Sequence, residues 1–268
     1  MAKEDDRLWY HNCVNAGIHM FSNHIFDKSY GLFRESKKVD LDREVLRPLI
    51  PSGKLFVYDS PEYVMDMGTP DRYYAVTEDI RNGKVQAKNL THKQKAIFLD
   101  RDGTINKYIG FLTDIEDFAL LPGAAQAIKL INQSGCLVIV VTNQPVIARG
   151  EVSLEGLQEI HNKMETLLGR DGAYLDAIYY CPHHPDKGFE GERAEYKIEC
   201  GCRKPKPGLL LKAAEDYNID LSQSWMVGDG DNDVMAGKSA GCRVAYLGNG
   251  KTEVPCFDNL LQFVRATL

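Results

Sequence analysis

The chain of 268 residues is long enough for one large or two small domains, and with 44% hydrophobic and 26% charged residues it has the composition of an ordinary globular protein. A net charge of −6, without a lysine or arginine run, argues against nucleic-acid binding through a basic face. No apolar run approaches the roughly 20 residues of a membrane span. The charged start MAKEDDRLWYHN also lacks the apolar core of a signal peptide, so we expect a cytoplasmic protein that binds neither nucleic acid nor membrane.

The first part of the chain mixes short apolar runs with two helical patterns. We expect a strand over 13–22, a helix over 40–53 that ends at Pro-Ser-Gly, a strand pair over 55–68, a helix over 70–83 and a polar linker over 84–94. Together they predict a small N-terminal region over residues 1–92.

From residue 95 onward, short runs rich in Ile and Val alternate with helical patterns. The runs predict strands over 96–100, 136–143, 176–182, 224–230 and 243–248, and the patterns between them predict helices over 123–135, 153–169, 208–218 and 233–241. Strands that are apolar on both faces and alternate with helices form parallel sheets covered on both sides. We therefore expect residues 93–268 to form a doubly wound α/β domain, with its ligand crevice beyond the carboxyl ends of the strands.

The stretch AIFLDRDGTIN, residues 96–106, places two carboxylates at such a strand end. Asp100 could attack phosphorus to form an aspartyl-phosphate, provided that a divalent cation such as Mg²⁺ neutralises the repulsion between the two anions. Asp102, two residues later, could protonate the leaving oxygen, and Gly103 allows the sharp turn that brings both groups to one place. A plain turn at the end of a strand is the alternative for this motif alone.

Three later motifs favour phosphate chemistry. Thr142 and Asn143 end a strand with a hydroxyl and an amide, and Lys204 stands just before a helix opened by Pro207. The stretch VGDGDND, residues 227–233, offers Asp229 and further carboxylates as oxygen ligands for Mg²⁺. A non-enzymatic scaffold would have no need to cluster these carboxylates.

Seven cysteines in a chain without an export signal argue against disulfides. We interpret Cys13, Cys136, Cys242 and Cys256 as small buried hydrophobic residues. The other three form a C-x-H…C-x-C set with one histidine: Cys181, His183, Cys200 and Cys202. Three thiolates and an imidazole suit a closed, structural, tetrahedral zinc site, in which His184 is an alternative ligand to His183. A chance grouping of cysteines on a loop is the other reading.

The motifs in this order resemble those of the haloacid dehalogenase superfamily of phosphohydrolases over residues 95–250. The resemblance implies that Asp100 is the nucleophile and a Mg²⁺ ligand, and that Asp102 is the general acid/base, with its main-chain carbonyl also on Mg²⁺. It implies catalytic roles for Thr142 and Lys204, a metal-ligand role for Asp229, and support of the metal by Asp233. Asp231 is expected to cap a helix or to be solvated.

The stretches DRDGTIN, TNQPVIARG, CPHHP and CGCRKPKPG together resemble the heptose 1,7-bisphosphate 7-phosphatases and the related histidinol-phosphate phosphatases. This resemblance implies the substrate-binding residues Tyr108, Ile109, Gly110, Phe111, Asn143, Gln144 and Arg203. The sequence departs from the family at Pro145-Val146, where Ser-Gly is usual, and at Gly230, where Lys is frequent. The short spacing between the first two motifs leaves no room for a large cap domain, so we expect the zinc loop to wall the substrate. Because Cys202 directly precedes Arg203 and Lys204, zinc would also fix both of them.

The stretches VNAGIHMFS and MDMGTPDRYYAV resemble the C-terminal third of sugar-phosphate nucleotidyltransferases. The glycine-rich nucleotide loop of those enzymes does not occur in the sequence, so we expect no transferase activity and a vestigial Asp66. The region is expected either to belong to a longer bifunctional enzyme or to serve in packing or dimerisation. A heptose-1-phosphate nucleotidyltransferase acts on the product of a heptose bisphosphatase, which favours a heptose bisphosphate over histidinol phosphate as substrate.

Overall fold

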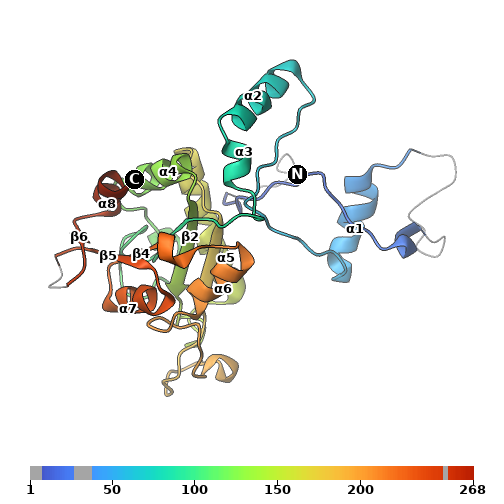
Figure 1. Ribbon diagram of the computed structural model, residues 1–268. Helices are drawn as coiled ribbons and strands as arrows, with labels where there is room; N and C mark the ends of the chain where they lie inside the picture. Colours follow the sequence, from blue (N-terminus) through green and yellow to red (C-terminus); the bar gives the residue numbers. More distant parts are fainter. Residues whose placement is uncertain (1–7, 27–37, 250–252) are drawn as a thin grey trace. The chain divides into compact units, whose positions relative to one another are not determined.

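The computed structural model describes residues 8–26, 38–249 and 253–268 (Figure 1). The chain divides into two compact units. One comprises Met1–Asn12 and Pro61–Leu268, and the other comprises Cys13–Ser60. The first unit contains every strand of the described part of the chain.

A six-stranded, all-parallel sheet forms the centre of the larger unit, in the order β3-β2-β1-β4-β5-β6. The strands are β1 (Ala96–Leu99), β2 (Leu137–Asn143), β3 (Ala177–Cys181), β4 (Trp225–Gly228), β5 (Arg243–Leu247) and β6 (Cys256–Phe257). β1 lies between β2 and β4, so the first motif of the sequence ends up in the middle of the sheet. The predicted doubly wound α/β fold is confirmed.

Helices cover both faces of this sheet (Figure 1). α4 (Ala124–Ser134), α5 (Leu154–Arg170) and α8 (Leu260–Thr267) contribute to one core, and α6 (Gly208–Asp216) and α7 (Asp231–Ala240) contribute to the other. Because successive side chains of a strand point to opposite faces, Ile97 and Leu99 enter the first core, whereas Ala96 and Phe98 enter the second.

Local signals place the helix ends where the sequence predicts them. Ser153 caps α5 by accepting a hydrogen bond from the main-chain N–H of Gly156. Gly135 and Gly241 end α4 and α7 in the left-handed conformation, which glycine adopts without strain. The predicted strands and helices of residues 95–248 are all present, whereas β6 and α8 were not predicted.

In the N-terminal part, the structure confirms the predicted helices but not the predicted strands. Residues 41–52 form three consecutive helical turns, among them α1 (Arg47–Leu49), that end at the left-handed Gly53. α2 (Pro70–Arg81) begins after the cap Thr69, and the short α3 (Lys84–Ala87) lies in the predicted linker. The predictions of a strand over 13–22 and of a strand pair over 55–68 were wrong. Neither segment pairs with another strand in the described chain, and most of their apolar side chains are exposed.

Two further findings concern the sequence predictions. Cys13 and Cys256 are exposed, so their interpretation as buried residues was wrong, and Cys136 and Cys242 are half-buried. Over the described residues, none of the helices has the length and apolar character needed to cross a membrane.

Candidate active site

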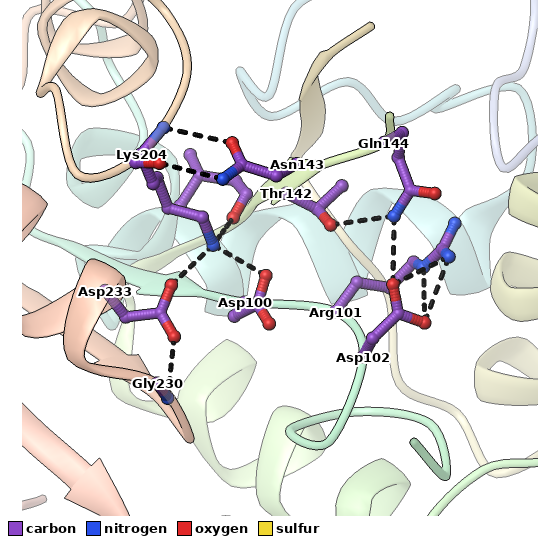
Figure 2. Close-up of polar contacts among 10 residues, drawn as sticks. Asp100, Arg101, Asp102, Thr142, Asn143, Gln144, Lys204, Gly230 and Asp233 are labelled. Carbon is purple, nitrogen blue, oxygen red and sulfur yellow. Dashed lines mark hydrogen bonds and ion pairs between the residues drawn. The ribbon is translucent and has the colours of Figure 1, made fainter. Parts of the chain in front are cut away.

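Three neighbouring strands deliver the predicted site residues to one edge of the sheet (Figure 2). Asp100 directly follows β1, and its main-chain N–H still bonds the Val227 carbonyl of β4 at 3.0 Å. Thr142 and Asn143 end β2, and Asp229 directly follows β4. The parallel topology therefore gathers residues that lie more than a hundred positions apart.

Lys204 contacts several of the groups at this edge of the sheet. Its buried Nζ lies 2.6 Å from Asp100 Oδ1, 2.6 Å from Asp233 Oδ1 and 2.7 Å from the carbonyl oxygen of Val141. The side chain of Asn143 donates to the main-chain carbonyl of Lys204 and accepts from its N–H, both at 3.0 Å (Figure 2). Lys204 is thus held at its main chain by Asn143 and at its Nζ by Asp100, Asp233 and the Val141 carbonyl.

The carboxylates around Lys204 form a candidate cation site. Asp100, Asp229 and Asp233 each offer an oxygen, and these oxygens all lie within 4.8 Å of one another. Burial raises the pKa of Asp100 to about 6; Lys204 opposes this rise and Asp233 adds to it. Burial and then the charge of Asp100 raise the pKa of Asp229 to about 6. Crowded, partly desolvated carboxylates fit the all-oxygen coordination of Mg²⁺, so the residues present suit the expected ion.

Small residues make this crowding possible. Gly103 has a φ of 83°, and a Cβ atom there would lie 1.9 Å from Asp229 Oδ2. Only glycine therefore lets the turn after β1 pass so close to Asp229. The main-chain N–H of Gly230 donates to Asp233 Oδ2 at 3.0 Å, which holds Asp233 against Lys204, while Asp231 is exposed in the first turn of α7.

The side chain of Asp102 is not part of the cluster formed by Asp100, Asp229 and Asp233. It is held by a separate set of hydrogen bonds (Figure 2). Arg101 Nη2 donates to both of its oxygens, at 3.0 and 2.8 Å. Asn106 Nδ2 donates to Oδ1 and Gln144 Nε2 to Oδ2, each at 2.9 Å. Gln144 also donates to the hydroxyl of the buried Thr142 at 3.0 Å, so the end of β2 helps to hold Asp102.

Sequence reasoning missed two buried residues behind Asp102. Arg101 is completely buried, and its Nη1 lies 3.3 Å from Nε2 of His161 on α5. Burial, together with the nearby charge of Arg101, lowers the pKa of His161 to about 3, so its imidazole is neutral. An arginine between two aspartates at a strand end could have drawn attention. Nothing in the sequence links it to a histidine 60 positions away.

The predicted substrate-binding loop lies at the surface next to the carboxylates. Tyr108, Ile109 and Phe111 are exposed, and Tyr108 lines a cavity of about 490 Å³ together with Gly103 and Asp229. Arg203 Nη1 donates to the His183 carbonyl at 3.3 Å. The substrate-binding roles of this loop, of Asn143 and Gln144, and of Arg203 stay predictions.

One arginine connects three loops around this region. The guanidinium of Arg149 lies 4.2 Å from the ring centre of Phe111 and 4.3 Å from that of Phe189. Its Nε pairs with Glu151 at 2.9 Å. Next to it, a Cβ on Gly150 would lie 1.9 Å from the Gly191 carbonyl oxygen, so the two loops are in direct contact.

The predicted zinc ligands converge as well. The Sγ atoms of Cys181, Cys200 and Cys202 lie 3.2–3.5 Å apart, and His183 Nδ1 lies 3.3 Å from the Sγ of Cys202. A tetrahedral ion with Zn–S bonds of about 2.3 Å needs sulfur atoms roughly 3.8 Å apart, so this donor set fits zinc with little adjustment. His184, the alternative ligand, stands outside the group.

Comparison with known proteins shows which family this chain belongs to. A model of haloacid dehalogenase-like hydrolases matches residues 58–241. The chain is 44% identical over 155 residues to a D-glycero-beta-D-manno-heptose-1,7-bisphosphate 7-phosphatase of Haemophilus ducreyi, a match covering 58% of this chain and 82% of that protein. It is 38% identical over 174 residues to the enzyme of the same name from Escherichia coli K12, covering 65% of this chain and 89% of that protein. A D-glycero-alpha-D-manno-heptose-1,7-bisphosphate 7-phosphatase of Burkholderia mallei is 40% identical over 155 residues, with 58% and 80% covered.

Solved structures agree. The chain superposes with a TM-score of 0.57 and 33% identity on the D,D-heptose 1,7-bisphosphate phosphatase of B. bronchiseptica complexed with magnesium and phosphate, over 65% of this chain and 97% of that one. A putative HAD-like phosphatase of Mesorhizobium loti gives a TM-score of 0.59 at 31% identity, over 65% and 85%. This chain belongs to the haloacid dehalogenase-like hydrolases.

Proposed function

We propose that this protein is a Mg²⁺-dependent phosphatase that removes the 7-phosphate of D-glycero-D-manno-heptose 1,7-bisphosphate. The observation that carries the proposal is the arrangement of Asp100, Lys204 and Asp229 at one sheet edge, with Asp102 held beside it. The heptose bisphosphatases among the relatives support the choice of substrate.

In the first step, a carboxylate oxygen of Asp100 attacks phosphorus, and the bond between phosphorus and the sugar oxygen breaks. Asp102 gives its proton to that oxygen, which leaves as the C7 hydroxyl. Lys204, 2.6 Å from Asp100, stabilises the negative charge of the transferring phosphoryl group. Mg²⁺ held by Asp100 and Asp229 would supply the remaining neutralisation of charge between the two anions.

In the second step, Asp102, now a carboxylate, takes a proton from a water molecule that attacks the aspartyl-phosphate. The bond between phosphorus and Asp100 breaks, and Asp100 regains its carboxylate. The donors around Asp102, which come from Arg101, Asn106 and Gln144, fix the orientation of its side chain for this step.

We further propose that Cys181, His183, Cys200 and Cys202 hold a structural zinc ion. Their convergence supports the proposal, as does a close approach beside them. A Cβ on Gly208 at the start of α6 would lie 2.3 Å from the Gly201 carbonyl oxygen, so the cysteine loop and the segment carrying Lys204 are packed together. Zinc would fix this loop, and with it Arg203 and Lys204.

Residues 1–92 are proposed to be a nucleotidyltransferase-like remnant that packs without transferring nucleotides, followed by the phosphatase domain over 93–268. Asp66 supports this, because its carboxylate accepts from the N–H of Gly68 and pairs with Arg72. Lys88 pairs at 2.6 Å with the buried Asp176, which ties the segment around Lys88 to the sheet of the same unit. The test is incubation with nucleoside triphosphates and heptose 1-phosphate, which should yield no nucleotide sugar, while Lys88→Met should lower the melting temperature.

Phosphate release with Mg²⁺ from the α and β anomers of heptose 1,7-bisphosphate tests the main proposal. Histidinol phosphate serves as the competing substrate and Asp100→Asn as the blank. We expect a clear preference for one heptose anomer. The anomer has to be measured, because relatives named for the alpha anomer and relatives named for the beta anomer both match this chain. Preference for histidinol phosphate, or no turnover of any of the three, would overturn the substrate assignment.

A further inference from the structure

His161 is a buried polar residue that the steps above do not use. It lies on α5, is 2% exposed, and packs its ring 5.8 Å from that of Tyr180. Its nearest polar contact is the 3.3 Å approach of Nε2 to Arg101 Nη1. A guanidinium can only donate hydrogen bonds, so Nε2 must accept, and the imidazole carries its proton on Nδ1.

Arg101 is therefore held from two sides. One edge of its guanidinium donates to the Asp102 carboxylate through Nη2 and, at 3.3 Å, through Nε. The other edge donates to His161. An arginine side chain has many rotamers, and a single ion pair at one edge leaves some of them open. The second contact selects the rotamer that presents two parallel donors to Asp102.

We propose that His161 is a positioning residue, which acts through Arg101 to hold the Asp102 carboxylate in the orientation needed for proton transfer. The inference rests on the proposed role of Asp102 as general acid. His161 contacts Arg101, and in this proposal it acts only through that arginine. Through His161, helix α5 helps to fix the conformation of the turn that follows β1.

A change in the leaving group separates this role from a general packing role. A sugar alkoxide leaves only when it is protonated, whereas p-nitrophenolate is a stable anion at neutral pH. Misplacing Asp102 should therefore slow the first step with an alkyl phosphate and spare it with p-nitrophenyl phosphate. The value of kcat/KM reports that first step, and general acid catalysis contributes about 10²- to 10⁴-fold.

The experiment compares His161→Leu and His161→Phe, which lack an acceptor, with His161→Gln, whose amide oxygen can accept from Arg101. Met164→Leu, equally buried on α5, controls for packing. With Mg²⁺ present, we expect the apolar variants to lose on the order of 10-fold in kcat/KM for the heptose bisphosphate or glycerol 3-phosphate, against less than about 2-fold for p-nitrophenyl phosphate. The Gln variant should recover most of the loss. Equal losses on both kinds of substrate, or none, would overturn the inference.

A crystal structure of His161→Leu keeps the inference testable whatever the enzyme hydrolyses. We expect the Arg101 guanidinium to leave at least one of its contacts with Asp102. A guanidinium that keeps both contacts without His161 contradicts the inference. Failure of wild-type protein to hydrolyse any alkyl phosphate would instead count against the proposed function, and the two failures are thereby distinguished.

Discussion

Two segments of this chain have almost the same sequence pattern, but one forms a buried strand and the other is an exposed segment without secondary structure. KLFVYD, residues 54–59, and KAIFLD, residues 95–100, each run from a lysine through four apolar residues to an aspartate. The second forms β1, with Phe98 completely buried. The first forms no strand, and Phe56 is 87% exposed.

The difference lies in what surrounds each run. β1 pairs with β2 on one side and β4 on the other, and helices cover both faces. Residues 54–59 have no strand partner in the described chain. An apolar run thus indicates a preference for burial, but it forms a strand only where a neighbouring strand can pair with it. For the same reason, Asp100 becomes part of a site, whereas Asp59 is a carboxylate at the end of an exposed segment.

The largest expected effect comes from replacing Asp100, with Asp59 as its counterpart in the exposed segment. Asp100→Asn removes the attacking oxygen anion and should lower kcat by at least about 10³-fold. The melting temperature should stay within about 3 °C, because relief of carboxylate crowding offsets the lost pair with Lys204. Phosphate release and thermal unfolding measure the two quantities, with Asp59→Asn as the matched control that should change neither. Full turnover by Asp100→Asn would refute its role as nucleophile.

The cysteine cluster gives the next largest effect. Elemental analysis should find one zinc ion per chain, and Cys202→Ser should lose it and lower kcat/KM by about 10- to 100-fold at saturating Mg²⁺, because Arg203 and Lys204 follow directly. Cys256→Ser, an exposed cysteine outside the cluster, should keep both the zinc and the activity. Metal-stripped protein that retains full turnover with Mg²⁺ alone would show that zinc does not position Lys204.

Much of the larger unit could be predicted from its sequence because each signal there is local. Apolar runs, helix periodicity and strand-end carboxylates located β1 to β5, and the parallel topology then brought Asp100 and Asp229 together. The two-residue β6 carries too few residues for a periodic signal, whereas the helical spacing of Leu260, Phe263 and Val264 in α8 was present in the sequence and was missed. The strands predicted over 13–22 and 55–68 failed because pairing is a property of two segments, and a single run cannot reveal it.

The parts of the site that escaped prediction are contacts between distant elements. Arg101 was visible in the sequence, but its burial and its bond to His161 depend on how α5 packs against the turn after β1. Likewise, Gln144 was predicted to bind substrate, and in the structure its side chain also donates to Asp102. Strand-end motifs identify which residues meet, whereas the residues that orient them come from other layers of the fold.

Truncating the two phenylalanines measures the contrast between the runs. Phe98→Ala should lower the free energy of unfolding by about 3–5 kcal/mol, since it opens a cavity beneath the sheet. Phe56→Ala should change it by less than about 0.5 kcal/mol, because its ring is already exposed. Urea unfolding followed by circular dichroism provides both values. A large loss from Phe56→Ala would mean that residues 54–59 are buried in solution against a partner.

The neutral His161 makes stability depend on pH. Its folded pKa, about 3, lies below the ordinary value of 6.5, so its contribution is present above pH 6.5 and is lost as the pH falls, because only the unfolded chain takes up the proton. Between pH 7.5 and 5, His161→Gln should therefore gain about 1–2 kcal/mol relative to wild type. Urea titrations at the two pH values measure this difference. A constant difference would mean that His161 is protonated in the folded state, which contradicts its role as acceptor for Arg101.

The smallest expected effect concerns the loops around the cavity rather than the strands. Arg149→Ala removes the guanidinium between Phe111 and Phe189, a contact worth about 0.5–2 kcal/mol, and should raise KM for the sugar bisphosphate by about 3- to 10-fold with little change in kcat. Arg149→Lys keeps the charge that pairs with Glu151 but loses the planar stacking, so most of the effect should persist. Since Asp100 and Lys204 are untouched, KM for p-nitrophenyl phosphate should stay unchanged. An equal rise in KM for both substrates would place Arg149 with the residues that hold the phosphate, and no rise for either would mean that the three loops keep their positions without it.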